Sequence, residues 1–375
     1  MQIPNQKLKV LVVDDMLTYR AILTQVLKEF EWVEVSGTAT NGQQAIEAMR
    51  KKPADLVLID LEMPVMNGLQ AVPLLRTQFP QSQVILISGT NQSSADLTLQ
   101  ALEAGAMDFI PKPNQDSLTA NMEELRQKLR AVTLTCLEKH KLSGQALAQM
   151  TQSASASTPR KSPGSTRISP VPYGFDIVAI GVSTGGPNAL SEVIPALPTN
   201  LGLPILIVQH MPPLFTASLA NMLDKKSALH VKEAENSELI LPNTVYIAPG
   251  GKHMKASQTL ASGKITILLD DTPPVNSCRP AVDVLFQSLP AIYGKRILSI
   301  ILTGMGSDGM AGVRQIKENG GYCLTQSADS CVVYGMPRSV DEQGLSDEQV
   351  PLSDLANRIQ QLVKTTKKDA LYVNP

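Results

Sequence analysis

The sequence predicts a two-domain α/β protein with a parallel sheet in each domain. The chain has 375 residues, which at about 150 residues per domain leaves room for two hydrophobic cores. On both sides of a segment rich in Ser and Pro, short β-branched runs alternate with helical patterns, as in βαβ units. We expect one domain over residues 1–130, a helical extension and linker over 131–172, and a second domain over 173–375.

Five strand-like runs make up the first domain, and helical patterns separate them. The first helix is expected from Tyr19 to Phe30, the second from about Gln43 to Lys51, and the third after Gly68. A flavodoxin-like sheet with strand order 2-1-3-4-5 accommodates this alternation. The runs, in chain order, are KVLVVDD, VEVSGTA, DLVLIDLEMP, QVILISG and AMDFIPKP.

The segment between the domains is predicted to be a linker. Apolar residues at helical spacing from about 118 to 150 are expected to close the first domain with a helix. Residues 151–172 then contain six Ser, three Thr, four Pro and one Gly, with no acidic or aromatic residue. Such a composition buries too little apolar surface to offset the entropy of ordering the chain.

The second domain is predicted to be a doubly wound α/β domain. Helical patterns lie between several of its apolar runs, and the polar residues cluster where the runs end. Ligands of open parallel sheets bind beyond the carboxyl ends of the strands, so these ends are the place to look for chemistry. The runs are FDIVAIGVS, LPILIVQHMP, TVYIAPGG, KITILLDD and RILSIILTGMG.

Composition and charge exclude several classes of function. With 43% hydrophobic and 18% charged residues and no uninterrupted apolar stretch of membrane-spanning length, we expect a cytoplasmic protein without membrane insertion. The four cysteines lack paired spacing, which favours reduced thiols. The net charge is −3 over residues 1–130, +4 over 131–172 and −2 over 173–375, so neither predicted domain has the basic excess of a nucleic-acid binder.

Charged side chains gather at the strand ends of the first domain. Asp14 and Asp15 end the first run, Asp60 the third and Ser88 the fourth, and Lys112 follows the fifth. In the expected strand order these groups converge, and carboxylates this close together require a cation. Mg²⁺, which prefers oxygen ligands and retains waters, suits the cluster and would orient a phosphoryl donor for attack by a carboxylate.

Residues 1 to about 125 resemble the receiver domain of bacterial response regulators. The resemblance implies that Asp60 is phosphorylated by a histidine kinase, and that Ser88, Lys112 and Phe109 respond to the phosphoryl group. It also implies a cis peptide bond at Lys112-Pro113. The Mg²⁺ ligand set that it implies is Asp14, Asp15, Asp60 and the backbone carbonyl of Glu62.

In the second domain, a strand-like run leads into the G-x-S-x-G sequence around Ser183. The sequence GVSTGGP is followed by a helical pattern, a context in which a serine lies on a sharp turn with its hydroxyl exposed. A capping serine in a glycine-rich turn is the alternative. The nucleophile interpretation requires a base, and His210 ends the buried run ILIVQH at the same sheet edge. The remaining histidines, His140, His230 and His253, lack such a context.

A carboxylate at a third strand end completes a possible Ser-His-Asp set. Asp308 lies in the glycine-rich segment after the run RILSIILTGMG. The same segment reads G-x-G-x-x-G, a dinucleotide-binding pattern. Asp308 would repel a pyrophosphate there, and the next run, YCLTQ, ends in Gln326 rather than an acidic residue, so nicotinamide binding is disfavoured.

Residues 173 to about 365 resemble the catalytic domain of the chemotaxis protein-glutamate methylesterases, the CheB family. The likeness rests on GVSTGGP, VQHMPP, FTASLA, YIAPGGKH, RPAVDVLF, LTGMGSDG and SCVVYGMPR. It implies Ser183 as nucleophile, His210 as base and Asp308 as orienting carboxylate, with Thr184 beside the histidine and the Met305 N–H as oxyanion donor. Two positions depart from the family pattern, namely Cys278, where a histidine is usual, and Met16.

The resemblance implies hydrolysis of γ-glutamyl methyl esters on cytoplasmic helices of chemoreceptors, and in many members deamidation of receptor glutamines. It implies no cofactor for the esterase domain, and it implies that the unphosphorylated receiver restricts access to the active site. Two alternatives stay open, a DNA-binding output and an adaptor without catalysis. The charge of the second domain and its βα pattern oppose the first alternative.

Overall fold

We describe the fold from a computed structural model that covers residues 7–112, 122–123, 125–137, 174–259 and 263–370. The chain divides into two compact units, residues 1–167 and 168–375, called unit 1 and unit 2 below. The predicted linker over 151–172, His140 and the Lys112-Pro113 peptide bond lie outside the described residues.

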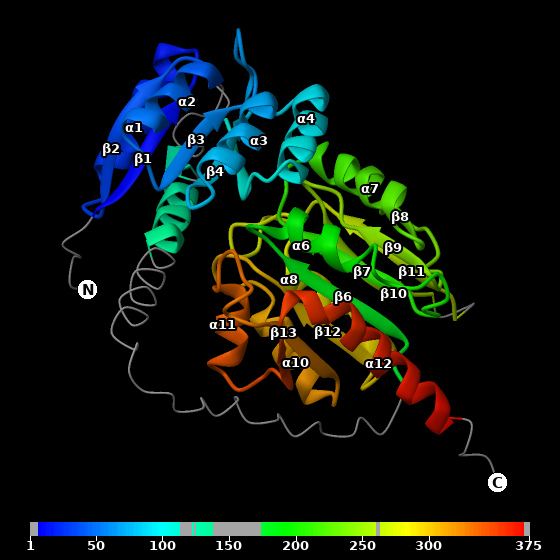
Figure 1. Cartoon of the computed structure of the whole chain (residues 1–375). Coiled ribbons are helices and arrows are strands. Elements are labelled where there is room, and N and C mark those ends of the chain that lie inside the picture. Colours follow the sequence, from blue (N-terminus) through cyan, green and yellow to red (C-terminus); the bar gives the residue numbers. More distant parts are fainter. Residues whose placement is uncertain (1–6, 113–121, 124, 138–173, 260–262, 371–375) are drawn as a thin grey trace, which may run out of the picture. The chain divides into compact units, whose positions relative to one another are not determined.

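Unit 1 contains a five-stranded parallel sheet in the order β2-β1-β3-β4-β5, as expected from the sequence (Figure 1). The central strands are buried along their whole length, which explains why they read as continuous apolar runs. A helix over 125–137 follows. The elements are β1 (Leu8–Val13), α1 (Leu17–Lys28), β2 (Val33–Ala39), α2 (Gly42–Lys51), β3 (Leu56–Asp60), α3 (Gly68–Gln78), β4 (Gln83–Ser88), α4 (Gln92–Glu103) and β5 (Asp108–Pro111).

Asparagine side chains begin three of the helices in unit 1. Asn41, Asn67 and Asn91 each precede a helix and accept a hydrogen bond from a backbone N–H in its first turn. At α3 the Gln70 side chain in turn accepts a hydrogen bond from the backbone N–H of Asn67, and the two bonds form a capping box. These caps fix where the loops after the strands end, and the loops carry the charged residues of the strand ends.

Unit 2 contains a seven-stranded parallel sheet in the order β14-β13-β12-β6-β7-β9-β8. Helices cover it on both sides, with α6 and α12 packed together and α8 and α10 packed together (Figure 1). The elements are β6 (Ile177–Val182), α6 (Gly186–Val193), β7 (Ile205–Gln209), α7 (Phe215–Lys226), β8 (His230–Glu233), β9 (Thr244–Ile247), β10 (His253–Gln258), β11 (Ile265–Asp270), α8 (Val282–Ser288), α9 (Pro290–Tyr293), β12 (Ile297–Ile301), α10 (Met310–Glu318), β13 (Tyr322–Gln326), α11 (Met336–Asp341), β14 (Glu348–Val350) and α12 (Leu352–Ala370).

One expected strand of the parallel sheet belongs elsewhere. The run KITILLDD forms β11, which pairs antiparallel with β10 in a separate two-stranded ribbon. The prediction that it joins the parallel sheet was therefore wrong. The physical reason is that only Ile267 of β11 is buried, whereas a central parallel strand is buried on both faces. Three short strands, β8, β10 and β14, were not expected, because they are polar or brief.

A hydrophobic core of unit 2 lies on one side of its sheet. Side chains of β6, β7, β9 and β12 pack there against α8, α10 and the β10-β11 ribbon. His253 of β10 is buried in this region, and its two ring nitrogens contact the carbonyl of Pro273 and the N–H of Ala281. This histidine is a satisfied core residue that supports the loop before α8.

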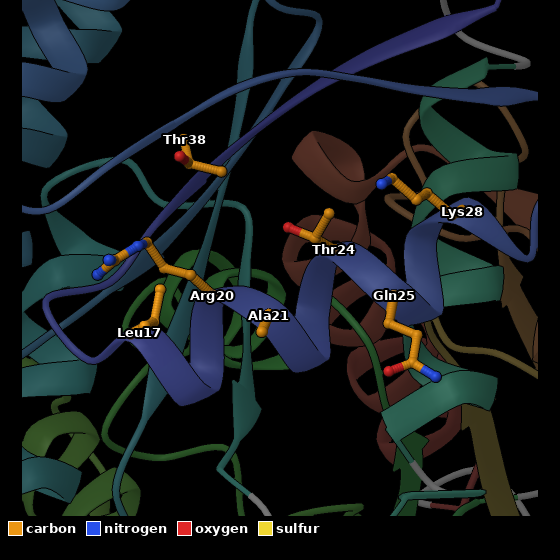
Figure 2. A pocket seen from close by; sticks show the side chains of 7 residues that line it. All are labelled: Leu17, Arg20, Ala21, Thr24, Gln25, Lys28 and Thr38. Atoms are coloured by element: carbon orange, nitrogen blue, oxygen red, sulfur yellow. The ribbon is translucent and has the colours of Figure 1, made fainter.

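A hollow of about 480 Å³ lies beside α1 in unit 1. Figure 2 shows Arg20, Thr24 and Lys28 along α1, with Thr38 of β2 across from them. No carboxylate, histidine or cysteine lines the hollow among the described residues. None of the helices in the described part of the chain has the length and apolar character that crossing a bilayer requires.

Candidate active site

In unit 1, the carboxylates of Asp14 and Asp60 share one lysine. Lys112 Nζ lies 2.7 Å from Asp60 Oδ2 and 3.0 Å from Asp14 Oδ2, and both aspartates are buried. The ammonium also lies over the ring of Tyr19. The structure therefore brings together three groups that the sequence places at the ends of β1, β3 and β5.

The electrostatic balance of this cluster favours a further cation. Burial raises the pKa of Asp60 to about 6, although the ion pair with Lys112 opposes the shift. Burial lowers the pKa of Lys112, but the bonds to Asp60 and Asp14 outweigh it and raise the pKa overall. One ammonium thus neutralises two buried carboxylates, which leaves an excess of negative charge.

The oxygens of this cluster fit a divalent metal ion. Asp14, Asp15 and Asp60 each offer a carboxylate oxygen within 4.8 Å of the others, and the buried Asp14 Oδ2 shares the Lys112 ammonium with Asp60. Such a donor set is typical of Mg²⁺. Arg20, which sequence reasoning missed, donates from Nη1 to the carbonyls of Asp14 and Asp15 and so fixes the loop after β1.

Of the other residues predicted for this cluster, two are buried in unit 1 and a third bonds to Asp60. Ser88 is fully buried, and its hydroxyl lies 2.7 Å from that of Thr98. Phe109 is buried on β5. Glu62 donates its backbone N–H to Asp60 Oδ1 at 3.5 Å, and the role of its carbonyl stays a prediction.

In unit 2, Ser183 and His210 follow neighbouring strands at adjacent positions. Val182 at the end of β6 pairs with Gln209 at the end of β7, and the His210 N–H donates to the Val182 carbonyl. The Ser183 carbonyl accepts from the Gln209 side chain at 3.0 Å and from the Gly186 N–H at 2.8 Å. These bonds hold the backbone of the serine in a sharp turn between β6 and α6.

Glycines make the turn at Ser183 possible. Gly185 has a φ of 76°, and a β-carbon at Gly186 would lie 1.8 Å from Gln209 Oε1. A β-carbon at Gly304 would lie 2.7 Å from Cβ of Ser183, so the glycine-rich loop after β12 touches the serine. Within the described chain, neither the Ser183 hydroxyl nor the Met305 N–H has a hydrogen-bond partner. Both groups are free to contact a substrate.

Asp308 is buried, and it contacts His210 directly. His210 Nε2 lies 2.8 Å from Asp308 Oδ2, and the N–H groups of Val282 and Asp283 at the start of α8 donate to the same carboxylate at 2.6 and 3.1 Å. Burial raises the pKa of Asp308, but the bonds to His210, to these N–H groups and to Asn276 outweigh it and lower the pKa overall. The carboxylate is therefore kept ionised.

A tight turn before α8 supplies two residues that sequence reasoning did not assign to the site. Asn276 and Ser277 have φ angles of 52° and 63°, and the backbones of Val275 and Cys278 bond to each other on either side. Asn276 Nδ2 donates at 2.9 Å both to Asp308 and to the buried Asp283. No sequence signal marks this asparagine, because the Asn-Ser pair lacks the glycine that usually identifies such turns.

The second residue from this turn is Cys278. Its sulfur lies 3.6 Å from Nδ1 of His210, on the side of the ring opposite Asp308. Burial lowers the pKa of His210, but the bonds to Asp308 and Cys278 outweigh it and raise the pKa to about 9. Asp308 contacts Nε2 and Cys278 contacts Nδ1, so both ring nitrogens have a partner among the described residues.

Asp283 and Thr184 complete the surroundings. Burial raises the pKa of Asp283, and the negative charge of Asp308 acts in the same direction. The two neighbouring carboxylates therefore have pKa values shifted in opposite directions. The Thr184 carbonyl accepts from the Thr303 hydroxyl at 2.9 Å. The expected contact between the Thr184 side chain and the histidine stays a prediction.

Comparisons with known proteins cover both units. Residues 178–359 match the family described as CheB methylesterase, and residues 10–123 match the response regulator receiver domain. A protein-glutamate methylesterase/protein-glutamine glutaminase of Desulfotalea psychrophila is 42% identical over 96% of this chain and 99% of its own length. The protein of the same description from Trichodesmium erythraeum is 40% identical over 94% of this chain and 98% of its own length.

Among solved structures, the CheB methylesterase catalytic domain of Thermotoga maritima is 44% identical to the chain. The match covers 51% of this chain and all of that domain, with a TM-score of 0.49.

We predict that His210 titrates above the usual histidine pKa of about 6.5, near the pKa of about 9 that its surroundings produce. Replacing Asp308 by Asn removes the charge that opposes burial, so the pKa of His210 should fall. NMR titration of the imidazole signals measures both values, and His230, which contacts Asp224, is the internal control. An unchanged His210 titration in the Asp308→Asn variant would show that the carboxylate does not govern the imidazole.

Proposed function

The chain belongs to the CheB methylesterase family, and we propose that unit 2 hydrolyses glutamate γ-methyl esters on the cytoplasmic helices of chemoreceptors. The observation that carries the proposal is the contact of His210 with the ionised Asp308, beside a serine whose hydroxyl is free within the described chain. The names of the relatives include glutaminase, so we extend the proposal to the side-chain amides of receptor glutamines.

Ser183, His210 and Asp308 would act as nucleophile, base and orienting carboxylate. The Ser183 oxygen attacks the ester carbonyl while its proton passes to Nδ1 of His210. Methanol leaves with that proton, and the imidazole then takes a proton from a water molecule that hydrolyses the acyl-enzyme. Asp308 retains the proton on Nε2 throughout and stabilises the imidazolium. Only the neutral imidazole accepts a proton, so activity should rise as the pH passes upward through the pKa of His210.

The tetrahedral intermediate requires a hydrogen-bond donor for its oxyanion. We assign this role to the Met305 N–H, because the preceding Gly304 touches Ser183 and the N–H has no partner within the described chain. One such donor contributes about 10²- to 10³-fold in rate. The bonds from Gly335 and Met336 to the Gly304 carbonyl hold this loop in place before substrate arrives.

Unit 1 would control the hydrolase through phosphorylation of Asp60 by a histidine kinase. Asp14, Asp15, Asp60 and the Glu62 carbonyl would hold Mg²⁺, which when bound neutralises the phosphoryl oxygens during transfer. Asp60 attacks the phosphorus atom as a carboxylate, and the bond between phosphorus and the histidine nitrogen of the kinase breaks. Lys112, already paired with Asp60, remains to bind the added phosphoryl charge, and Ser88 and Phe109 would reorient in response.

The two alternative functions, a DNA-binding output and an adaptor without catalysis, predict different properties of the chain. A DNA-binding output is disfavoured by the match of residues 178–359 to a methylesterase family. An adaptor without catalysis would not require a histidine that contacts an ionised carboxylate and follows the strand next to that of a serine. Removal of the nucleophile therefore separates the adaptor from the enzyme.

Replacing Ser183 by Ala should lower methanol release from methylated receptor by at least about 10³-fold, because the nucleophile is lost. The matched control is Ser191→Ala on α6, whose buried hydroxyl has no partner in the described chain and should be dispensable. Release of methanol is measured by gas chromatography. Equal rates for wild type and Ser183→Ala would refute the hydrolase mechanism.

A small-molecule phosphodonor should raise methanol release by about 5- to 150-fold, the usual range of coupling between two sites. Asp60→Asn should abolish this rise and leave the basal rate, since its amide cannot accept the phosphoryl group. Asp96→Asn on the exposed face of α4 is the control and should respond like wild type. Full activation of Asp60→Asn would contradict the assignment of the phosphorylation site.

A further inference from the structure

Cys278 is the cysteine that stands apart from the other three. Cys136, Cys323 and Cys331 are buried, whereas Cys278 is partly exposed and contacts the candidate catalytic residue His210. Its sulfur lies 3.6 Å from His210 Nδ1, and His210 also retains partial exposure, with 12% of its side chain open to solvent. A thiol and an imidazole nitrogen thus face each other where a solute has access to both.

The separation of these two atoms matches that of two ligands of one zinc ion. Zinc binds sulfur at about 2.3 Å and imidazole nitrogen at about 2.0 Å, and a tetrahedral angle places the two ligand atoms about 3.5 Å apart. The observed distance is 3.6 Å. Neither residue would have to move far to bind the ion.

The partners of the two side chains prepare them for a metal. Histidines that bind metals usually donate their other N–H to a carboxylate, and Asp308 accepts from Nε2 of His210 in that manner. The lone pair of Nδ1 then points toward Cys278. The position of Cys278 is also restrained, because its backbone exchanges two hydrogen bonds with that of Val275 across the tight turn.

We propose that Cys278 Sγ and His210 Nδ1 bind Zn²⁺, with water in the remaining positions, and that binding stops the hydrolase. The thiol gives up its proton when the sulfur–zinc bond forms. Nδ1 likewise releases the proton that it carries in the imidazolium form, donates its lone pair to the ion and so no longer accepts the proton of Ser183. The ion is an inhibitor of the site and takes no part in hydrolysis. The effect on activity rests on the proposed function, but the binding itself does not.

Binding is tested on the full chain by the rate at which iodoacetamide labels Cys278, followed by peptide mass spectrometry. Zinc sulfate at micromolar concentration should slow labelling of wild type by at least about tenfold, and His210→Gln should lose most of this protection, since loss of a metal-site group costs about 10- to 100-fold in affinity. Absence of protection in wild type would overturn the proposal, as would equal protection in His210→Gln. The wild-type measurement stands even if the variant fails to fold.

Inhibition is tested by methanol release, with each variant compared with its own rate without zinc. Wild type should be inhibited, and Cys278→Ser should require at least about tenfold more zinc, although it retains the three buried cysteines. His230→Gln, which removes an exposed imidazole paired with Asp224, should remain as sensitive as wild type. Equal sensitivity of Cys278→Ser, or loss of sensitivity in His230→Gln, would contradict the proposal. If wild type releases no methanol at all, the proposed function fails, and the labelling experiment still decides whether zinc binds.

Discussion

Asp308 is buried in unit 2, and the N–H groups at the start of α8, the amide of Asn276 and the imidazole of His210 all donate to its carboxylate. Burial alone would protonate such a group, because the ionised form loses its hydration. Here the donors outweigh burial and the pKa is lowered. The ionised carboxylate raises the pKa of His210 and contacts Nε2 of its ring. The chemistry proposed for unit 2 depends on this one charge.

In the acidic cluster of unit 1, burial and hydrogen-bond donors also compete, but there the pKa of a carboxyl is raised. Asp60 is as buried as Asp308, but Lys112, which pairs with Asp60, also pairs with Asp14. Burial therefore raises the pKa of Asp60 to about 6. The difference lies in the number of donors. A carboxylate with several fixed donors is held in its charged form, whereas one that shares a single ammonium gains from a divalent cation nearby.

The sequence predicted the parts of the sites that lie at strand ends. The apolar runs of β6 and β7 stop at Ser183 and His210, and parallel pairing places the ends of neighbouring strands together, so the residue types were enough. The strand order of the sheet in unit 1 was likewise predicted from the sequence. The antiparallel pairing of β11 was missed, because a short apolar run does not reveal which partner it has.

Loop residues were predicted less well, for a related reason. Asn276 and Cys278 owe their positions to a left-handed turn and to the bonds that close it, and neither has a periodic pattern in the sequence. The sequence marks Cys278 only as a departure from the family pattern, yet its sulfur contacts the ring that the proposed reaction uses. The orientation of that ring also depends on three-dimensional contacts, because a sequence does not show which ring nitrogen contacts which partner.

In the proposed mechanism, Ser183 and His210 act as one unit that Asp308 orients. This cooperation is tested most directly by comparing methanol release by Ser183→Ala, His210→Gln and the double variant, all normalised to wild type. Residues that act together are not additive, so the double variant should lose no more activity than the more damaging single change. Losses that multiply in the double variant would mean that the two side chains act independently, which contradicts a shared role in one proton transfer.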